Sequence, residues 1–221
     1  MRLEQLIERF RVEAGDLLEP YLWEPDWLPG WFSEAQDEAA VRARLLLDDY
    51  TPELCTIAVA PGTASYPLHA KLYEIASLRL ESADRPCEPV LVTREKLDRI
   101  EPGWRYLPEG APRWAIQTDT RLRLVPAPAT AGSLRLEAYR LPLKALSLDT
   151  DKPEIHEAHH LQLVQWVLYR AFGKPDSDAH DPQRSKQALD EFERYFGLRP
   201  DADLRRSTRH DEVQANVSYV L

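Results

Sequence analysis

Hydrophobic and polar positions alternate with two different periods along the chain, and the change of period divides it into three zones. In residues 1–50, apolar residues recur every three or four positions from Leu3 to Phe10, which predicts an amphipathic helix. Residues 51–149 change to a period of two, which is typical of strands. Residues 150–197 return to helical spacing.

A segment rich in tryptophan and proline interrupts the first helical zone. After it, Ser33 and Gln36 stand three positions apart and have the form of a capping box, with Ser33 at the N-cap. We therefore expect a second helix to begin at Ser33 and to bury one apolar side as far as Leu46.

The alternating zone contains several short strand patterns separated by turn residues. One strand is expected from Tyr73 to Glu81, and Thr93 is placed to cap a short helix over residues 94–100. Residues 121–142 have the clearest hairpin pattern. The apolar face of that hairpin consists of Leu122, Leu124, Leu134, Leu136 and Ala138. These patterns predict a small antiparallel β-sandwich or barrel.

Two helices are predicted in the last zone. Asp151 has the character of an N-cap with Pro153 in the first turn, and the helix is expected to end at Phe172. Apolar residues occupy most of its circumference, which indicates burial on nearly all sides. A more amphipathic helix is expected between Asp181 and Gly197.

Helical zones at both ends with strands between them predict an α+β fold. We expect residues 1–50 and 150–197 to form one discontinuous helical bundle and residues 51–149 to form an inserted β domain. Residues 198–221 are predicted to form an extended C-terminal arm. The arm ends in alternating apolar residues, so it is expected either to bind a partner or to stay unstructured before binding.

Composition indicates a globular chain. Of the 221 residues, 43% are hydrophobic, which supplies enough apolar area for a core. No apolar run approaches the roughly 18 residues of a membrane-spanning helix, and the acidic N-terminus does not resemble a signal peptide. Cys55 and Cys87 are too few for a disulfide framework or a thiolate zinc cluster, so we expect folding in a reducing cytoplasm.

Charge argues against a general nucleic-acid binder. The formal net charge is −9, whereas such a binder needs basic surface to neutralise phosphates. The excess is local, because residues 1–50 contain 12 acidic and 5 basic residues.

One segment carries a metal-binding pattern. His156, Glu157 and His160 satisfy H-E-x-x-H, in which two imidazoles on one helix face bind Zn²⁺ and the glutamate acts as a base. The motif falls in the first turn of its predicted helix, and no specific third ligand follows it. A charged helix start is therefore the favoured interpretation, with a zinc hydrolase as the remote alternative.

Other chemistry is sparse. The chain has no G-x-S-x-G, no glycine-rich phosphate loop and no C-x-x-C, so we predict no catalytic residue, metal or cofactor and no enzyme. Trp23, Trp27 and Trp31 lie near acidic residues, which disfavours stacking on nucleic acid. We expect these tryptophans to be hydrophobic anchors at a subunit interface.

Four segments give the chain a recognisable pattern. They are PYLWEPDWLPGWFSEAQDEAAVRARLLL, the strand that leads to Pro61-Gly62, LRLVPAPATAGSLRLEAYRLPL and PEIHEAHHLQLVQWVLYRAF. In this order, over about residues 15–197, the chain resembles the head-to-tail adaptor proteins of tailed bacteriophages, also called connector or head-completion proteins.

The resemblance implies a structural virion protein. It implies a ring, usually twelvefold, that docks beneath the portal protein, extends the DNA channel and offers a platform to a neck or tail protein. The implied partners are the portal, neighbouring adaptor subunits and that downstream protein, while DNA passes without specific binding and no membrane is involved. The implied location is the head-tail junction of the virion, after assembly in the host cytoplasm.

Three features of the sequence fit this resemblance. A helix as apolar on all sides as 161–172 would suit burial against lateral neighbours in a ring. An acidic first zone would repel DNA if it faced the channel. The C-terminal arm is expected to engage the portal through Arg205, Arg206, Arg209, Val213, Val217, Tyr219 and Leu221. The alternative is a binding module that uses the β domain and forms no ring.

Overall fold

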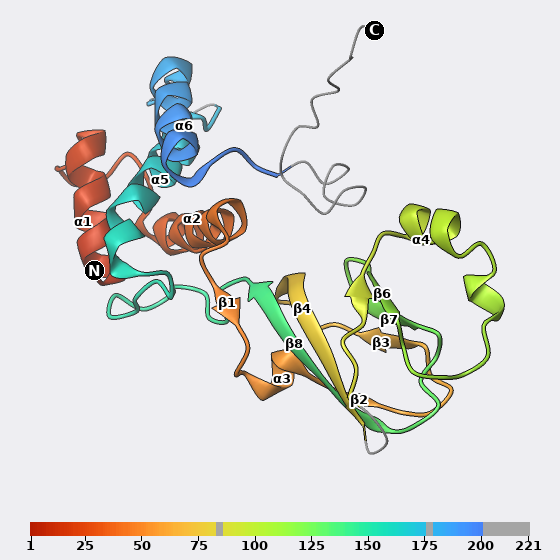
Figure 1. Ribbon diagram of the computed structural model, residues 1–221. Coiled ribbons are helices and arrows are strands. Elements are labelled where there is room, and N and C mark those ends of the chain that lie inside the picture. Colours follow the sequence, from red (N-terminus) through yellow and green to blue (C-terminus); the bar gives the residue numbers. More distant parts are fainter. Residues whose placement is uncertain (83–85, 176–178, 201–221) are drawn as a thin grey trace, which may run out of the picture. The chain divides into compact units, whose positions relative to one another are not determined.

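The chain folds into two compact units, both visible in Figure 1. The computed structural model describes residues 1–82, 86–175 and 179–200. The helical unit comprises Met1–Cys55, His69–Ala76 and Leu136–Arg199. The β unit comprises Thr56–Leu68 and Ser77–Arg135. Helices and sheets are both present, which confirms the α+β class. The helical unit takes more of the chain than the predicted domain, including residues 69–76 and 136–149.

The helical unit is built from α-helices and two short 3₁₀ helices. They are α1 (Leu3–Ala14), η1 (Pro25–Trp27), α2 (Leu28–Ala43), α3 (Pro52–Cys55), η3 (Glu157–Gln162), α5 (Leu163–Phe172) and α6 (Pro182–Phe196). Helix α5 packs against α1, α2 and α6 and is the centre of the core. The apolar circumference of α5 is therefore covered within one chain. The predicted burial on most sides is confirmed, and the chain's own helices account for it without lateral neighbours.

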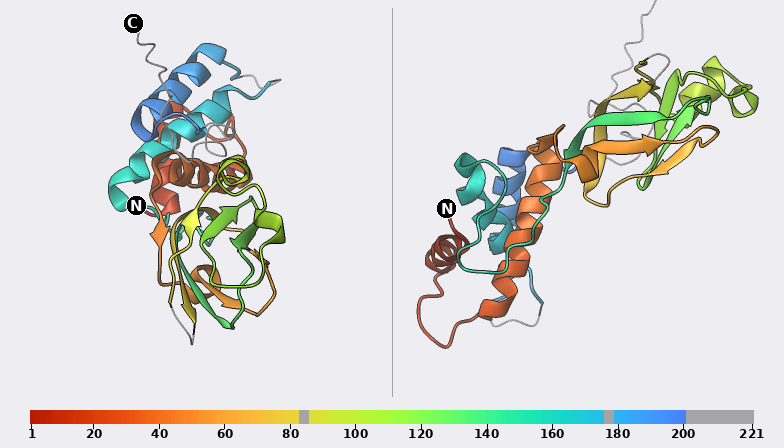
Figure 2. Two further views of the ribbon diagram at one scale, coloured as in Figure 1. Left: turned by 45° about the vertical axis from the view of Figure 1, so that its right-hand side comes forward. Right: turned by 90° about the horizontal axis from the view of Figure 1, so that it is seen from below.

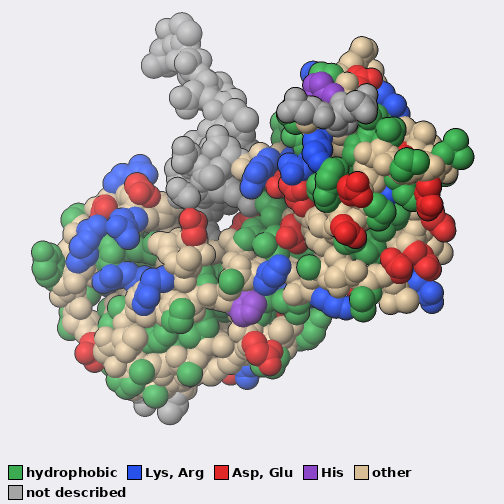
Figure 3. Space-filling model, turned by 180° about the vertical axis from the view of Figure 1, so that it is seen from behind, with side chains coloured by type: hydrophobic (Ala, Val, Ile, Leu, Met, Phe, Trp, Pro, Cys, Tyr) green, Lys and Arg blue, Asp and Glu red, His purple; other side chains and the backbone are tan. Residues whose placement is uncertain are grey.

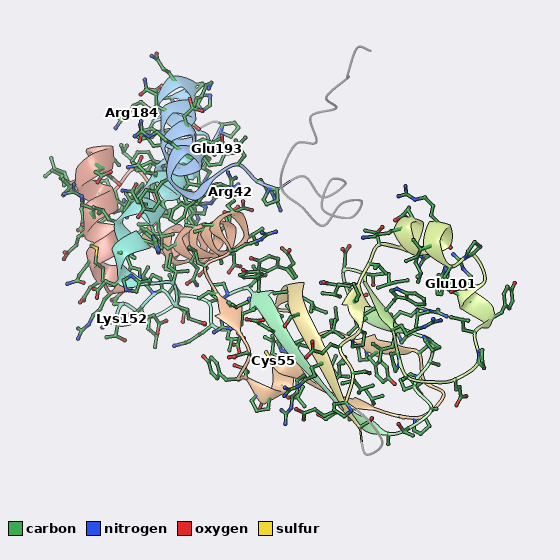
Figure 4. All side chains as sticks on the ribbon, viewed as in Figure 1. Arg42, Cys55, Glu101, Lys152, Arg184 and Glu193 are labelled. Atoms are coloured by element: carbon green, nitrogen blue, oxygen red, sulfur yellow. The ribbon has the colours of Figure 1, made fainter. Side chains whose placement is uncertain are left out.

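One arginine joins two helices around this core. Arg42 of α2 forms ion pairs with Glu38 at 3.1 Å and with Glu193 of α6 at 3.1 Å (Figure 4). Its guanidinium also lies 5.4 Å from the ring centroids of Trp166 and Phe192. Arg42 thus covers the aromatic end of the core while its charge is neutralised.

Helix α2 begins five residues earlier than its sequence pattern predicts. Its first turn contains Pro29, whose fixed φ favours a helix start. Ser33 is consequently inside the helix, where its hydroxyl donates to Pro29 O at 2.9 Å. The predicted capping box at Ser33 and Gln36 is wrong, and Gln36 is buried and donates to Lys144 O at 3.2 Å.

The helix expected from Asp151 also begins later, at η3. Asp151 instead accepts hydrogen bonds from the backbone N–H groups of Ser147 and Leu148 and from Lys144 Nζ. The bond from Lys144, followed by those from the backbone, holds the pKa of Asp151 well below its usual range. Because this carboxylate stabilises a loop, it does not cap a helix. By contrast, α6 lies between Asp181 and Gly197 as predicted, and Asp181 caps it.

The described part of the chain forms two four-stranded sheets. The strands are β1 (Leu47–Asp48), β2 (Thr56–Val59), β3 (Ser65–Pro67), β4 (Leu72–Ser82), β5 (Val90–Leu91), β6 (Trp114–Gln117), β7 (Arg121–Val125) and β8 (Gly132–Arg140). In the first sheet, β8 pairs with β1, β2 and β4. The second has the order β3-β7-β6-β5, with β5 and β6 parallel.

The predicted hairpin over residues 121–142 is wrong in its pairing. Strands β7 and β8 have the expected burial pattern, but they belong to different sheets. The six residues between them include Pro126 and Pro128, which cannot donate backbone hydrogen bonds and do not form a tight turn. The alternation of apolar and polar residues thus identified the buried faces of β7 and β8. The strands that pair with them lie in other segments of the chain.

Two further elements of the β unit are a helix and a 3₁₀ helix. Helix α4 (Arg94–Ile100) begins as predicted, since Thr93 Oγ1 accepts a hydrogen bond from Lys96 N at 3.2 Å. The 3₁₀ helix η2 (Trp104–Tyr106) follows it. A core cluster of Val92, Leu97, Trp104, Ile116 and Val125 joins α4 and η2 to the second sheet. None of the helices in the described part of the chain is long and apolar enough to cross a membrane.

A buried ion cluster ties β1 to β8 in the helical unit. Arg140 donates from Nε to Asp48 at 2.7 Å and from a terminal nitrogen to Glu154 at 2.7 Å. Asp48 also accepts from the backbone of Tyr50 and from the backbone and hydroxyl of Thr51. Although burial opposes its charge, these hydrogen bonds lower the pKa of Asp48 to about 2.

Gly132 permits a close approach of β8 to β4. A Cβ atom there would lie 2.5 Å from the backbone oxygen of Glu81. We expect Gly132→Ala to lower the free energy of unfolding by about 1–3 kcal/mol in urea titrations, because the strands must separate. Gly30→Ala in α2 is the control: its Cβ would meet nothing within 4 Å, and it should raise stability by about 0.5–1 kcal/mol. Equal effects of the two variants would contradict this explanation.

Candidate functional site

The H-E-x-x-H segment does not form an α-helical turn. His156 is the N-cap of the 3₁₀ helix η3, and its Nδ1 accepts from Ala158 N at 3.2 Å. Because a 3₁₀ helix has three residues per turn, side chains four positions apart do not share one face. The arrangement of His156 and His160 that zinc binding requires is therefore not formed.

His160 and Glu157 have structural partners instead. His160 Nε2 lies 2.8 Å from Ile155 O, and its Nδ1 lies 2.9 Å from the Met1 amino group. The same amino group donates to Glu157 at 2.8 Å. Burial lowers the pKa of His160, which favours the neutral ring with one donor and one acceptor. Both ring nitrogens are occupied, so this histidine is a core residue of the helical unit.

The thiol of Cys55 also has a structural partner, and the described residues bring no cluster of metal ligands together. Across residues 1–82, 86–175 and 179–200, no three His, Cys, Asp or Glu side chains form a group that could hold a metal. Cys55 is buried and donates to Asp48 O at 3.2 Å. Burial, with the nearby charge of Asp48, raises the pKa of Cys55 to about 12, so the thiol is protonated at neutral pH.

The three tryptophans that were predicted to be interface anchors have different environments. Trp23 is 1% exposed, and its ring makes edge contacts with Phe10 and Phe172. Its Nε1 donates to Ala171 O at 3.1 Å. Trp23 is therefore an anchor of the chain's own core and offers no surface to a partner. Trp27 and Trp31 lie nearer the surface, with ring centroids 5.9 Å apart.

Trp27 and Trp31 line a surface pocket of about 440 Å³, which we call the tryptophan pocket. The other residues of its lining come from the end of α5 and the segment after it: Tyr169, Arg170, Gly173, Lys174 and Pro175. Lys174 Nζ lies 3.0 Å from the centroid of the Trp27 ring. The pocket thus combines aromatic walls with a cationic rim, a combination suited to a partner with apolar and acidic side chains.

A second surface was not predicted from the sequence. The segment 16–24 between α1 and η1, here the leucine loop, exposes Leu17, Leu18 and Leu22. Leu18 is 84% exposed. Large apolar side chains gathered on one surface segment are typical of interaction sites. The available signal was Gly15, which ends the helical spacing and leaves these leucines outside the helix.

Charge differs strongly between the two units. The segments of the helical unit contain 25 acidic and 15 basic residues, and those of the β unit contain 8 acidic and 10 basic residues. On the face seen in Figure 3, both units show side chains of both signs, with acidic ones spread widely over the helical unit and arginine and lysine ones clustered on the β unit. The acidic excess predicted for the first zone is thus a property of the whole helical unit.

The predicted portal-binding residues of the arm lie outside the described residues. They are Arg205, Arg206, Arg209, Val213, Val217, Tyr219 and Leu221. Their role stays a prediction from the sequence.

Comparison with known proteins adds the family. A search among curated proteins found no match. The model of one family, described as SU10 adaptor protein, matches residues 1–215, which include both units. A match over this length covers the helical core, the inserted sheets and most of the arm. The chain therefore belongs to the SU10 adaptor protein family.

Proposed function

We propose that this chain is the head-to-tail adaptor of a tailed bacteriophage, a structural virion protein that assembles as a ring of twelve subunits beneath the portal. The family match over residues 1–215 is the observation that carries this proposal. In this role the ring extends the DNA channel and provides the docking platform for a neck or tail protein.

The surfaces of the helical unit support an assembly role. Its core is closed within one chain, yet the leucine loop and the tryptophan pocket leave large apolar side chains at the surface. Such patches on a self-sufficient subunit fit contacts with other proteins. The acidic excess of the same unit would disfavour tight binding of passing DNA.

Binding to the portal tests the proposal. Native mass spectrometry of the full chain mixed with the portal protein of the same phage should detect about twelve copies loaded on each portal ring. Failure of the wild-type chain to bind the portal would refute the adaptor role. Binding of a ligand by the isolated β unit would favour the binding module.

The C-terminal arm can be tested in the same assay. Deletion of residues 205–221 should remove loading or weaken it at least about tenfold, since the arm is proposed to engage the portal. Val217→Asp should weaken loading, whereas Ser218→Asp, on the other set of alternating positions, is the matched control. Unchanged loading after the deletion would assign portal binding to another surface.

A further inference from the structure

We propose that the leucine loop of one copy docks into the tryptophan pocket of the next copy, so that subunits join head to tail. This inference rests on the proposed function, because a ring requires a repeated contact between two different surfaces of the same chain. It assigns the two surfaces by residue.

The leucine loop is held in a fixed shape. Gly15, at φ 80°, ends α1 in the left-handed region that favours glycine. The next residue, Asp16, is buried and forms an ion pair with Arg11, and it accepts a hydrogen bond from Leu22 N at 2.9 Å. The Arg11 guanidinium lies 4.0 Å from the centroid of the Tyr21 ring. These contacts close the loop at its base, so that its leucines are presented to solvent without a large loss of entropy on binding.

The leucine loop does not fill the pocket of its own chain. None of the residues that line the pocket belongs to segment 16–24. The right-hand view of Figure 2 shows the connection between α1 and α2 looping beside the start of α2. Because Asp16 and the buried Trp23 fix both ends of the loop, it cannot turn into that pocket.

Charge identifies a second copy as the occupant. Glu19 and Glu24 of the loop are exposed and form no ion pair within residues 1–82, 86–175 and 179–200. On the pocket, Lys174 faces the Trp27 ring and likewise has no carboxylate partner in the described chain. Arg170 beside it pairs with Glu34 at 3.3 Å. Acidic residues of the loop, beside its leucines, therefore complement a cation above Trp27 on the other surface.

The geometry has a consequence for assembly. When two different surfaces of one chain meet, each added copy leaves one loop and one pocket open. Such heterologous contacts continue until a rotation closes them into a ring. The proposed contact therefore produces assemblies larger than a dimer.

Two variants separate the surfaces. Leu18→Glu places a charge on the most exposed leucine of the loop, and Lys174→Glu opposes the acidic residues of an incoming loop. Each should weaken self-association about thirtyfold or more, measured by sedimentation velocity and native mass spectrometry of the full chain. Leu148→Glu, at an exposed leucine of the helical unit outside both surfaces, is the matched control and should assemble as the wild type does. Circular dichroism and urea titration check that all three variants fold.

Mixing the two variants gives the sharpest result. The Leu18→Glu copy retains a functional pocket and the Lys174→Glu copy retains a functional loop, so an equimolar mixture should form one-to-one dimers and stop there. The double variant Glu19→Lys/Lys174→Glu, which exchanges the charges, should recover part of the wild-type association.

The outcomes distinguish this inference from the proposed function. Variants that assemble like the wild type, or a mixture that stays monomeric, would overturn the inference and leave the adaptor role standing. A wild-type chain that stops at a closed dimer would overturn the head-to-tail arrangement. A wild-type chain that stays monomeric up to millimolar concentration but loads onto the portal would overturn only the contact. A chain that does neither would overturn both.

Discussion

Replacing Arg140 with methionine is expected to lower the free energy of unfolding by about 3 kcal/mol or more. Arg140 neutralises Asp48, which is 1% exposed, and also binds Glu154. Methionine fills a similar volume but leaves the Asp48 carboxylate buried without its cationic partner, which is the costly way to break a buried ion pair. Urea titration at neutral pH, with one unfolding signal for each unit, measures the loss.

The same variant should change the pH dependence of stability. Because hydrogen bonds lower the pKa of Asp48 to about 2, its ionisation stabilises the folded state by about 2.5 kcal/mol above pH 4. This contribution is lost as the pH falls through 4 toward 2. In Arg140→Met the pKa of Asp48 should rise toward its ordinary value, so the part of the acid-dependent loss due to Asp48 becomes smaller.

A matched arginine provides the control. Arg135→Met removes an exposed arginine that lies 3.6 Å from the half-buried Glu81 and donates to Thr56. Exposed pairs contribute little, so the expected loss is below about 1 kcal/mol. Equal losses in the two variants would mean that burial of the Arg140 cluster does not determine its energetic weight.

Replacing Trp23 with alanine is the second change with a large expected effect, a loss of about 3–5 kcal/mol. The change leaves a cavity between Phe10 and Phe172. It also removes the donor to Ala171 O, one of the last carbonyls of α5, which has no partner within the helix. Urea titration monitored by far-ultraviolet circular dichroism measures the loss.

Two further variants show which property of Trp23 causes the loss and whether burial is required for it. Trp23→Phe should retain part of the stability, because it keeps most of the ring volume but not the hydrogen bond. Trp27→Ala, at an exposed tryptophan four residues later, should cost less than about 1 kcal/mol. If Trp27→Ala were as destabilising as Trp23→Ala, Trp27 would be a core residue and could not serve a surface contact.

Local signals allowed several elements to be predicted from the sequence. Thr93 and Asp181 cap the helices that follow them because each side chain binds backbone N–H groups only two or three residues away. The period-two pattern of β7 and β8 identified their buried residues for a similar reason. In each of these cases, the information that sets the structure lies within a few residues.

Other features depend on distant residues and could not be predicted in this way. Asp151 has the chemistry of an N-cap, but Lys144 and two backbone N–H groups of a loop compete for it. The partners of β7 and β8 lie in other parts of the chain. Trp23 and Trp27 have similar neighbours in the sequence, yet only Trp23 faces the rings of Phe10 and Phe172. The candidate site was found only in part, since the tryptophans were identified and the leucine loop was not.

The coverage of α5 by its own chain separates folding from assembly. A subunit whose central helix is already packed against α1, α2 and α6 does not need a neighbour to complete its fold. Its thermal unfolding temperature should then be independent of protein concentration under conditions where it is monomeric. In the proposed ring, assembly would then be a bimolecular docking of folded subunits, and its timing would follow subunit concentration and the first contact rather than the rate of folding.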